Sequence, residues 1–195
     1  VEGLAHLDAA RANGDGVIVV SGHFTTLEMC ARLACDSVPL AGMYRRYPQP
    51  AMEWAVLRGR SRYAAGMFAK DDVRGVVKHL KRGGLLWYAP DQDPSKGDSV
   101  FVPFFNQPAK SLTSTHQLAR LSGAAVVMFQ HIRRDDGGYT LRFWPALEHF
   151  PSDNAGADTA RVIAAIEAMA RDAPEQYLWI HRRFKRRPDG VPVYD

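Results

Sequence analysis

The stretch Val17-Ile18-Val19-Val20-Ser21-Gly22-His23-Phe24-Thr25-Thr26-Leu27-Glu28 decides the fold class. Its four β-branched residues, 17–20, predict a strand that is buried on both faces, and Gly22 ends that strand. Over 25–35 the apolar residues recur with the spacing of one helix face. A buried strand that turns directly into a helix is typical of parallel sheets.

The same alternation of apolar strands and helices continues along the chain. The turn at 135–138 predicts a hairpin between the last two strands. We therefore expect an α/β fold, with a mostly parallel central sheet flanked by helices and an antiparallel edge. Residues 176–185 fit a strand or a helix equally well. The other expected strands are 40–44, 85–89, 124–132 and 139–144, and the other helices run over 50–60, from 71 or 72 to 81, from 111 or 113 to 121, and over 158–171.

The longest candidate functional loop spans 91–105. It is rich in Pro, Gly and Asp, yet it also carries Phe101, Val102, Phe104 and Phe105. An apolar loop of this kind either tucks under the domain or faces an apolar partner, such as an acyl chain or a membrane. The sequence leaves both interpretations open.

Composition sets the broad class. The 195 residues are 46% hydrophobic and 24% charged, which is typical of one globular domain spanning 1–195. Two cysteines argue against a disulfide scaffold, and no run of 18 apolar residues predicts a membrane-spanning helix. Lys and Arg number 25 against 21 Asp and Glu, with clusters at 45–62 and 181–187. Such clusters indicate anionic partners or, equally, a solvated basic face.

The histidine of the opening stretch is the sharpest candidate for chemistry. His23 follows a buried strand at its carboxyl end, where parallel sheets place their sites, and Glu28 lies five residues later. In one regular helix the two would stand about 140° apart, so pairing requires His23 to lie outside the helix, which Gly22 allows. A paired carboxylate would make the imidazole a base for a substrate hydroxyl. The alternative is that His23 caps the helix and Glu28 is a surface residue.

Further residues are candidates for substrate binding. Arg45 follows one expected strand and Arg60 ends one expected helix, and arginine grips phosphate with two parallel N–H groups. Asp91 and Asp93 follow another strand, where they could orient an arginine, accept substrate hydroxyls or bind a cation. No ligand set completes a metal site, so we expect no metal and no other cofactor. Loop solubility would explain each of these residues equally well.

Taken in order, these motifs resemble the late acyltransferases of lipid A biosynthesis, the lauroyl/myristoyl transferase family. That family belongs to the glycerolipid acyltransferase superfamily, whose motif is His-x4-Asp/Glu. The closing stretch, with PEQY at 174–177 and HRRFK at 181–185, is the most specific part. The resemblance covers nearly the whole chain and is carried by 22–28, 42–45, 87–93, 100–105, 118–124 and 173–185.

The resemblance implies a glycerolipid-acyltransferase-like fold and a function. The family transfers a fatty acyl chain from acyl carrier protein to a hydroxyl of a phosphorylated, Kdo-bearing lipid A precursor. It acts at the cytoplasmic face of the inner membrane, so the implied partners are acyl carrier protein, that precursor and the membrane surface, with no nucleic acid. His23 and Glu28 match its catalytic dyad, and Arg45 and Arg60 match positions proposed to hold the phosphate-bearing substrate. Family members begin with a membrane anchor, so we expect this chain to be a C-terminal fragment without it.

Two other functions stay open at this stage. A related acyltransferase that acts on another glycolipid or on a lysophospholipid would use the same dyad, although the closing stretch favours lipid A. A basic module that binds nucleic acid or membranes without catalysis would need basic and aromatic residues on one element. Only 181–187, together with Trp179, approaches that pattern.

Overall fold

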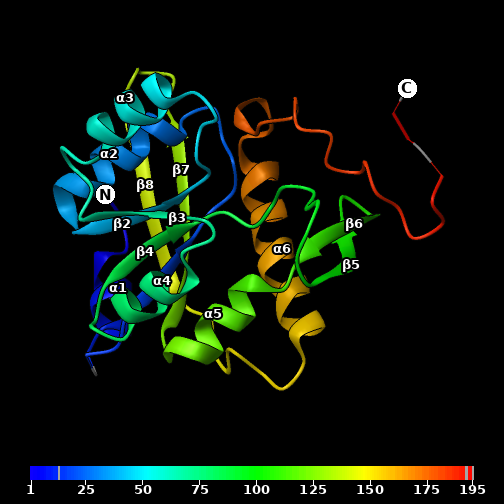
Figure 1. Cartoon of the computed structure of the whole chain (residues 1–195), viewed down its shortest axis with the longest axis horizontal. Helices are drawn as coiled ribbons and strands as arrows, with labels where there is room; N and C mark the ends of the chain where they lie inside the picture. The colour runs from blue at the N-terminus through cyan, green and yellow to red at the C-terminus, as the bar shows by residue number, and fades with distance from the viewer. Residues whose placement is uncertain (13, 192, 195) are drawn as a thin grey trace.

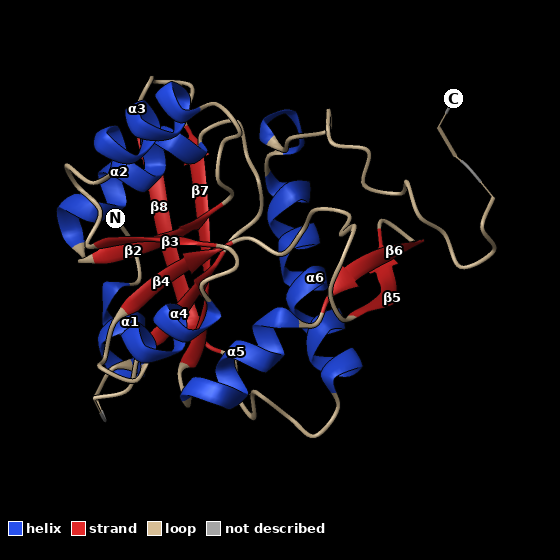
Figure 2. Cartoon of the chain, viewed as in Figure 1, coloured by secondary structure: helices blue, strands red, loops and turns tan. Residues whose placement is uncertain are grey.

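The computed structural model describes residues 1–12, 14–191 and 193–194 (Figure 1). Within these residues a six-stranded sheet runs in the order β3-β2-β4-β1-β7-β8, and β5 and β6 form a separate pair (Figure 2). The large sheet is parallel except for β8, which runs antiparallel to β7 at one edge. The expected α/β class, with its mostly parallel sheet and antiparallel edge, is confirmed.

The observed bounds equal the predicted ones for β1, β2 and α3 and differ by a few residues in the other predicted elements. The strands are β1 (Val17–Val20), β2 (Leu40–Tyr44), β3 (Gly66–Ala69), β4 (Leu85–Tyr88), β5 (Ser99–Phe104), β6 (Gln107–Leu112), β7 (Ala125–Arg133) and β8 (Tyr139–Ala146). The helices are α1 (Leu4–Ala10), α2 (Leu27–Ser37), α3 (Pro50–Arg60), α4 (Val73–Leu80), α5 (Ser114–Ser122) and α6 (Ala155–Asp172), with a short 3-10 turn at Pro174–Gln176.

Four elements, α1, β3, β5 and β6, were not predicted. The short helix α1 and the short edge strand β3 carry weak periodic signals, and the pair β5–β6 replaces part of the expected loop. The hairpin turns at Phe105 and Asn106, which both adopt positive φ, of 49° and 58°. A two-residue turn of this kind is usually marked by glycine, and this one has none.

The hairpin also shows where the apolar residues of the expected loop lie. Val102 and Phe104 point into the core, whereas Phe101 stays partly exposed. Figure 1 shows α6 standing between the large sheet and β5–β6, and α6 contacts both strands of the hairpin. This loop therefore tucks against the domain.

Alternate residues of β1 build two separate cores. Ile18 and Val20 join a cluster supplied by α4, α5, α6 and the hairpin, whereas Val17 and Val19 join a cluster supplied by α1 and α2. Successive side chains of a strand point to opposite faces, so a strand covered by helices on both sides is apolar throughout. The continuous run at 17–20 reflects this double burial.

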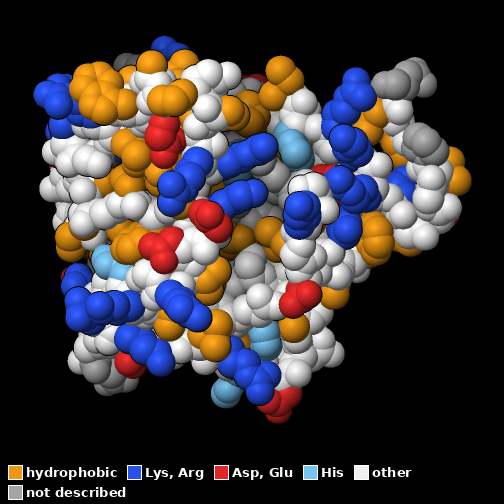
Figure 3. All heavy atoms as spheres, in the orientation of Figure 1, with side chains coloured by type: hydrophobic (Ala, Val, Ile, Leu, Met, Phe, Trp, Pro, Cys, Tyr) orange, Lys and Arg blue, Asp and Glu red, His pale blue; other side chains and the backbone are white. Residues whose placement is uncertain are grey.

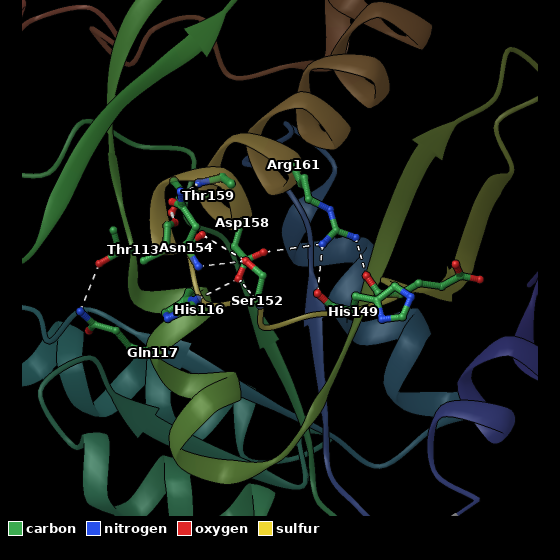
Figure 4. A network of polar contacts seen from close by, with 12 residues as sticks. Thr113, His116, Gln117, His149, Ser152, Asn154, Asp158, Thr159 and Arg161 are labelled. Atoms are coloured by element: carbon green, nitrogen blue, oxygen red, sulfur yellow. Dashed lines mark hydrogen bonds and ion pairs between the residues drawn. The ribbon is translucent and has the colours of Figure 1, made fainter.

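A buried polar network joins α5 to α6 (Figure 4). His116 Nδ1 lies 2.8 Å from Asp158 Oδ2, and the same oxygen accepts the backbone N–H of Ser152 at 2.7 Å. Arg161 lies 3.6 Å from the other carboxylate oxygen. Burial alone would raise the pKa of Asp158, but the bonds from His116 and Ser152 lower it. The pair holds the two helices together.

We expect Asp158→Ala to reduce the free energy of unfolding by about 3–5 kcal/mol, because it leaves His116 buried without its partner. Urea unfolding at pH 7 measures this. The exposed Asp153→Ala is the control and should stay within about 0.5 kcal/mol of the parent. Because the folded pKa of Asp158 is lowered, its contribution is present above the ordinary carboxyl pKa and is lost as pH falls through the folded value. Equal urea midpoints for the parent and Asp158→Ala would contradict this role.

No helix among the described residues is long and apolar enough to cross a bilayer.

Candidate active site

The carboxyl ends of β1 and β4 bring a histidine and an aspartate together. These two strands are parallel neighbours, with Val20 opposite Tyr88. His23 lies three residues beyond Val20, and Asp91 lies three residues beyond Tyr88. Equal offsets from paired strand ends place the two side chains at the same edge of the sheet, which is where parallel sheets bind ligands.

Asp91 holds His23 through two contacts. His23 Nδ1 lies 2.6 Å from Asp91 Oδ1, and the backbone N–H of His23 donates to Asp91 Oδ2 at 2.8 Å. An ionised carboxylate can only accept hydrogen bonds, so Nδ1 carries the hydrogen and Nε2 is left with a free lone pair. The imidazole is 27% exposed, whereas the carboxylate is 2% exposed. The arrangement is that of a general base oriented from behind by a carboxylate.

Gly22 allows this close approach. A Cβ at that position would lie 2.9 Å from Ile166 Cγ2 and 3.4 Å from Asp91 Oδ2. The first distance is shorter than carbon atoms tolerate, so a side chain at Gly22 would push the turn away from α6. The glycine that ends the strand therefore also positions His23 over Asp91.

The charges of the pair are mutually stabilised. Burial alone would lower the pKa of the His23 imidazole, but its hydrogen bond to Asp91 and the carboxylate's charge raise it above the ordinary value. Burial alone would raise the pKa of Asp91, but the bonds from His23 and from the Tyr177 hydroxyl lower it. His131, buried nearby on β7, has its pKa lowered to about 4 by burial and by His23. His131 is therefore neutral at pH 7, and His23 is the histidine here poised to exchange a proton.

The structure corrects the expected contact between His23 and Glu28. The carboxylate on His23 belongs to Asp91, whereas Glu28 binds Arg60 through both Nε, at 3.3 Å, and one terminal nitrogen. Glu28 lies in the first turn of α2 and its side chain is 61% exposed, while His23 sits before that helix and faces the end of β4. A catalytic role for Glu28 stays a prediction, but its direct partner is an arginine.

A largely apolar pocket of about 470 Å³ opens beside His23. This volume is in the range of ligand-binding sites. Glu28, Arg45 and Arg60 line the pocket together with His23, so the two predicted arginines are both at the site. Its apolar wall is formed by Leu27, Ala31, Cys35, Leu40, Ala41, Met43, Tyr63, Ala64, Met67 and Trp87.

The two predicted aspartates lie behind the imidazole and outside the set of residues that line the pocket. Both oxygens of Asp91 are occupied by protein donors. The side chain of Asp93 is 2% exposed and pairs with Arg186. A substrate contact for either carboxylate stays a prediction. In this structure Asp91 holds His23, and Asp93 pairs with an arginine, which is one of the roles that the sequence offered.

No three His, Cys, Asp or Glu side chains converge as metal ligands anywhere in residues 1–12, 14–191 and 193–194.

Comparison with known proteins decides the family. A sequence profile of the bacterial lipid A biosynthesis acyltransferases matches residues 1–186. The chain belongs to this family. Among its relatives are two lipid A biosynthesis enzymes of Escherichia coli (strain K12). The lauroyltransferase is 41% identical over 98% of this chain and 63% of its own length, and the palmitoleoyltransferase is 42% identical over 97% and 62%.

A more distant family member extends the comparison. The lipid A biosynthesis myristoyltransferase of the same organism is 24% identical over 97% of this chain and 59% of its own length. The chain therefore spans less than two thirds of the length of these acyltransferases.

Sequence reasoning missed one neighbour of the His23–Asp91 pair. Tyr177 is 5% exposed, and its hydroxyl donates to Asp91 Oδ2 at 2.9 Å. The sequence of residues 176–185 fits a strand or a helix equally well. The structure shows an irregular segment in which Tyr177 forms an isolated antiparallel bridge with Phe24. The available signal was the position of Tyr177 in the closing stretch, which the resemblance had singled out as specific.

The basic cluster that ends this stretch is only partly a surface. Arg183 is 3% exposed and donates to Lys110 O and to Ser111 Oγ. Arg186 pairs with Asp93, while Arg182 and Lys185 are exposed. Figure 3 shows Lys and Arg side chains gathered on this face of the molecule. Two of the cluster's cations are therefore held by contacts within the protein, and one of them, Arg183, is buried.

Proposed function

We propose that the chain carries the acyl-transfer centre of lipid A late acylation. It moves a fatty acyl chain from acyl carrier protein to a hydroxyl of a Kdo-bearing lipid A precursor, with His23 as the general base. The observation that carries this proposal is the His23–Asp91 pair at the wall of an apolar pocket of about 470 Å³. Family membership supports the reaction class.

The chemistry follows from the two ring nitrogens. Nδ1 is bonded to Asp91, so Nε2 takes the proton from the acceptor hydroxyl as its oxygen attacks the thioester carbonyl. A tetrahedral oxyanion forms, and its collapse breaks the carbon–sulfur bond. The proton on Nε2 then passes to the departing thiolate, and the imidazole returns to its starting state. Asp91 stabilises the imidazolium between these two transfers.

The oxyanion needs donors at the pocket. The start of α2 offers few, since the N–H groups of Thr25 and Leu27 already donate to Gln176 O and Phe24 O. Arg60 is the better candidate, because Glu28 fixes its guanidinium and its side chain is only 21% exposed. Arg45 lies exposed on the pocket wall and suits an anion further out, such as a phosphate of the precursor. In this assignment Glu28 acts by orienting Arg60.

We expect Arg60→Lys to lower kcat/KM about 10- to 100-fold, because lysine keeps the charge but cannot reproduce the two-nitrogen contact with Glu28. Steady-state kinetics with acyl carrier protein as donor measure this. Arg74→Lys, exposed on α4, is the matched control and should leave kcat/KM unchanged. An Arg60→Lys protein with parental kcat/KM would remove Arg60 from the reaction.

The surface around the pocket supports docking to an anionic lipid surface, which we place at the cytoplasmic face of the inner membrane. Helix α3 follows the pocket wall and has no fully buried residue. Its Met52 and Trp54 are exposed, and the Arg58 guanidinium lies 5.3 Å from the Trp54 ring centroid. Exposed aromatic and cationic side chains together are typical of membrane-surface helices.

Arg182 and Lys185 add positive charge that suits the acidic acyl carrier protein. If binding to anionic lipid vesicles and to acyl carrier protein did not weaken as salt increases, that result would contradict this docking.

Product masses test the proposed function. The purified protein is incubated with acyl carrier proteins of several chain lengths and a tetra-acyl, Kdo-bearing precursor, and the products are weighed by mass spectrometry. We expect addition of one acyl chain to the precursor and release of free carrier thiol. Transfer to a lysophospholipid or another glycolipid, with none to the precursor, would instead support the alternative acceptor. Duplex DNA binding without thioester consumption would overturn the enzymatic proposal.

A further inference from the structure

The segment that follows α6 binds the His23 turn through its backbone. Gln176 O accepts the N–H of Thr25 at 2.8 Å, and the N–H of Leu178 donates to His23 O at 3.0 Å. These two bonds flank Tyr177 and fix its side chain beneath the turn. We call residues 176–186 the closing segment.

The same segment binds the loop after β4 through side chains. The Tyr177 hydroxyl donates to Asp91 Oδ2 at 2.9 Å. His181 Nε2 accepts the backbone N–H of Asp93 at 2.8 Å, and Arg186 pairs with the Asp93 carboxylate. The closing segment therefore contacts both the turn that carries the base and the loop that carries its carboxylate.

Ring packing and buried hydrogen bonds hold the closing segment in place. The Tyr177 ring packs edge-on against Phe24 and Trp179, with centroids 5.4 and 4.9 Å away. Arg183 anchors the middle of the segment to β6 through Lys110 O and Ser111 Oγ. Fixed side chains lose little freedom when they orient a neighbour, so such contacts hold a functional group within a narrow range of positions.

We propose that the closing segment is a positioning element for the His23–Asp91 pair, in which the Tyr177 hydroxyl orients the Asp91 carboxylate and His181 holds the loop that carries it. The inference rests on the proposed role of His23 as base. Tyr177 and His181 are not among the residues that line the pocket, so in this proposal they act through Asp91 and His23.

A positioning role for Tyr177 should affect a measurable quantity, the pKa of His23. The charged and titratable neighbours of the pair are His131 on β7, Tyr88 on β4, and His181 and Arg183 on the closing segment. The hydrogen bond from the Tyr177 hydroxyl stabilises the negative charge of the Asp91 carboxylate. Without this bond the carboxylate would attract the imidazolium proton of His23 more strongly. Removing that hydroxyl should therefore raise the pKa of His23 while the ring contacts stay in place.

The test is Tyr177→Phe, which removes one oxygen and keeps the ring. We expect kcat to fall about tenfold at pH 7 with KM for both substrates unchanged, because one hydrogen bond to a charged group is lost and no substrate contact is. The acidic limb of the kcat/KM profile should move to higher pH. Tyr139→Phe is the matched control: it removes the same oxygen from a partly buried tyrosine at the start of β8, outside the pocket lining, and its profile should overlay the parent's. Unchanged kcat and an unshifted profile in Tyr177→Phe would overturn the proposal.

A second pair of variants carries the test if Tyr177→Phe does not fold. His181→Ala removes the acceptor for the Asp93 N–H, and we expect kcat to fall while KM holds. In His181→Gln the amide oxygen can accept the same N–H, so this variant should recover most of the loss. Equal activity of His181→Ala and the parent, or no recovery in His181→Gln, would refute the role of the segment.

An NMR titration of the His23 ring separates this inference from the proposed function. It needs no substrate and is recorded on the parent and on Tyr177→Phe. An upward shift in the His23 pKa supports positioning by Tyr177 even if the parent transfers no acyl chain. Identical titrations would refute positioning even if the parent is a fully active acyltransferase.

Discussion

His23→Ala should lower acyl transfer by about 10²- to 10⁴-fold, the usual contribution of a general base. The substitution removes the nitrogen that takes the hydroxyl proton and leaves the other side chains that line the pocket in place. Because the precursor and the acyl donor keep their other contacts, kcat should carry the loss and KM should change little. Single-turnover transfer from acyl carrier protein to the precursor measures the chemical step directly.

Two controls make the His23→Ala result decisive. His6→Ala, exposed on α1, changes the same residue type away from the site and should transfer at the parental rate. Thermal unfolding of His23→Ala should remain cooperative, which shows that the loss is chemical. A folded His23→Ala protein with full transfer activity would defeat the mechanism.

Asp91→Asn should also be strongly damaging, by roughly 10³- to 10⁴-fold, although it changes only one atom. At the Oδ2 position the carboxylate accepts the backbone N–H of His23 and the Tyr177 hydroxyl. Two donors already point there, so the asparagine must place its oxygen at that position and its NH2 group against His23 Nδ1. Nδ1 then becomes the acceptor, the hydrogen moves to Nε2, and Nε2 can no longer take a proton.

The tautomer itself can be observed. Nitrogen NMR of His23 should show hydrogen on Nδ1 in the parent and on Nε2 in Asp91→Asn. Asp36→Asn, an exposed change at the end of α2, should leave both the tautomer and the rate unaltered. The double variant His23→Ala/Asp91→Asn should be no slower than His23→Ala, because the two residues act as one unit. Fully additive losses would show that Asp91 works independently of His23.

Much of the fold could be predicted because its signals are local. The unbroken apolar run at 17–20 marks a strand covered on both faces, and the turn at 135–138 marks the antiparallel edge. These patterns depend on how side chains repeat along a strand or helix, which any short window of sequence contains. The hairpin β5–β6 escaped because Phe105 and Asn106 form its turn without glycine.

The candidate site divides along the same line. The sequence predicted that His23 stands at the carboxyl end of a buried strand. It also singled out Arg45 and Arg60 as binding candidates, and both line the same pocket. The partner of His23 was not evident. Glu28 is close in sequence, but the side chain that contacts the imidazole is Asp91, which is 68 residues away.

By itself the sequence determined the α/β class, the strand that ends at His23 and the family of the chain, because all three are written in local periodicity and ordered motifs. The tertiary structure alone decided that β4 lies beside β1. Because of this strand order Asp91 contacts the His23 imidazole and the Tyr177 hydroxyl, while Glu28 pairs with Arg60. Hydrogen-bond partners at a strand end depend on which strands are neighbours, and strand order is set by how the helices pack across the sheet as a whole.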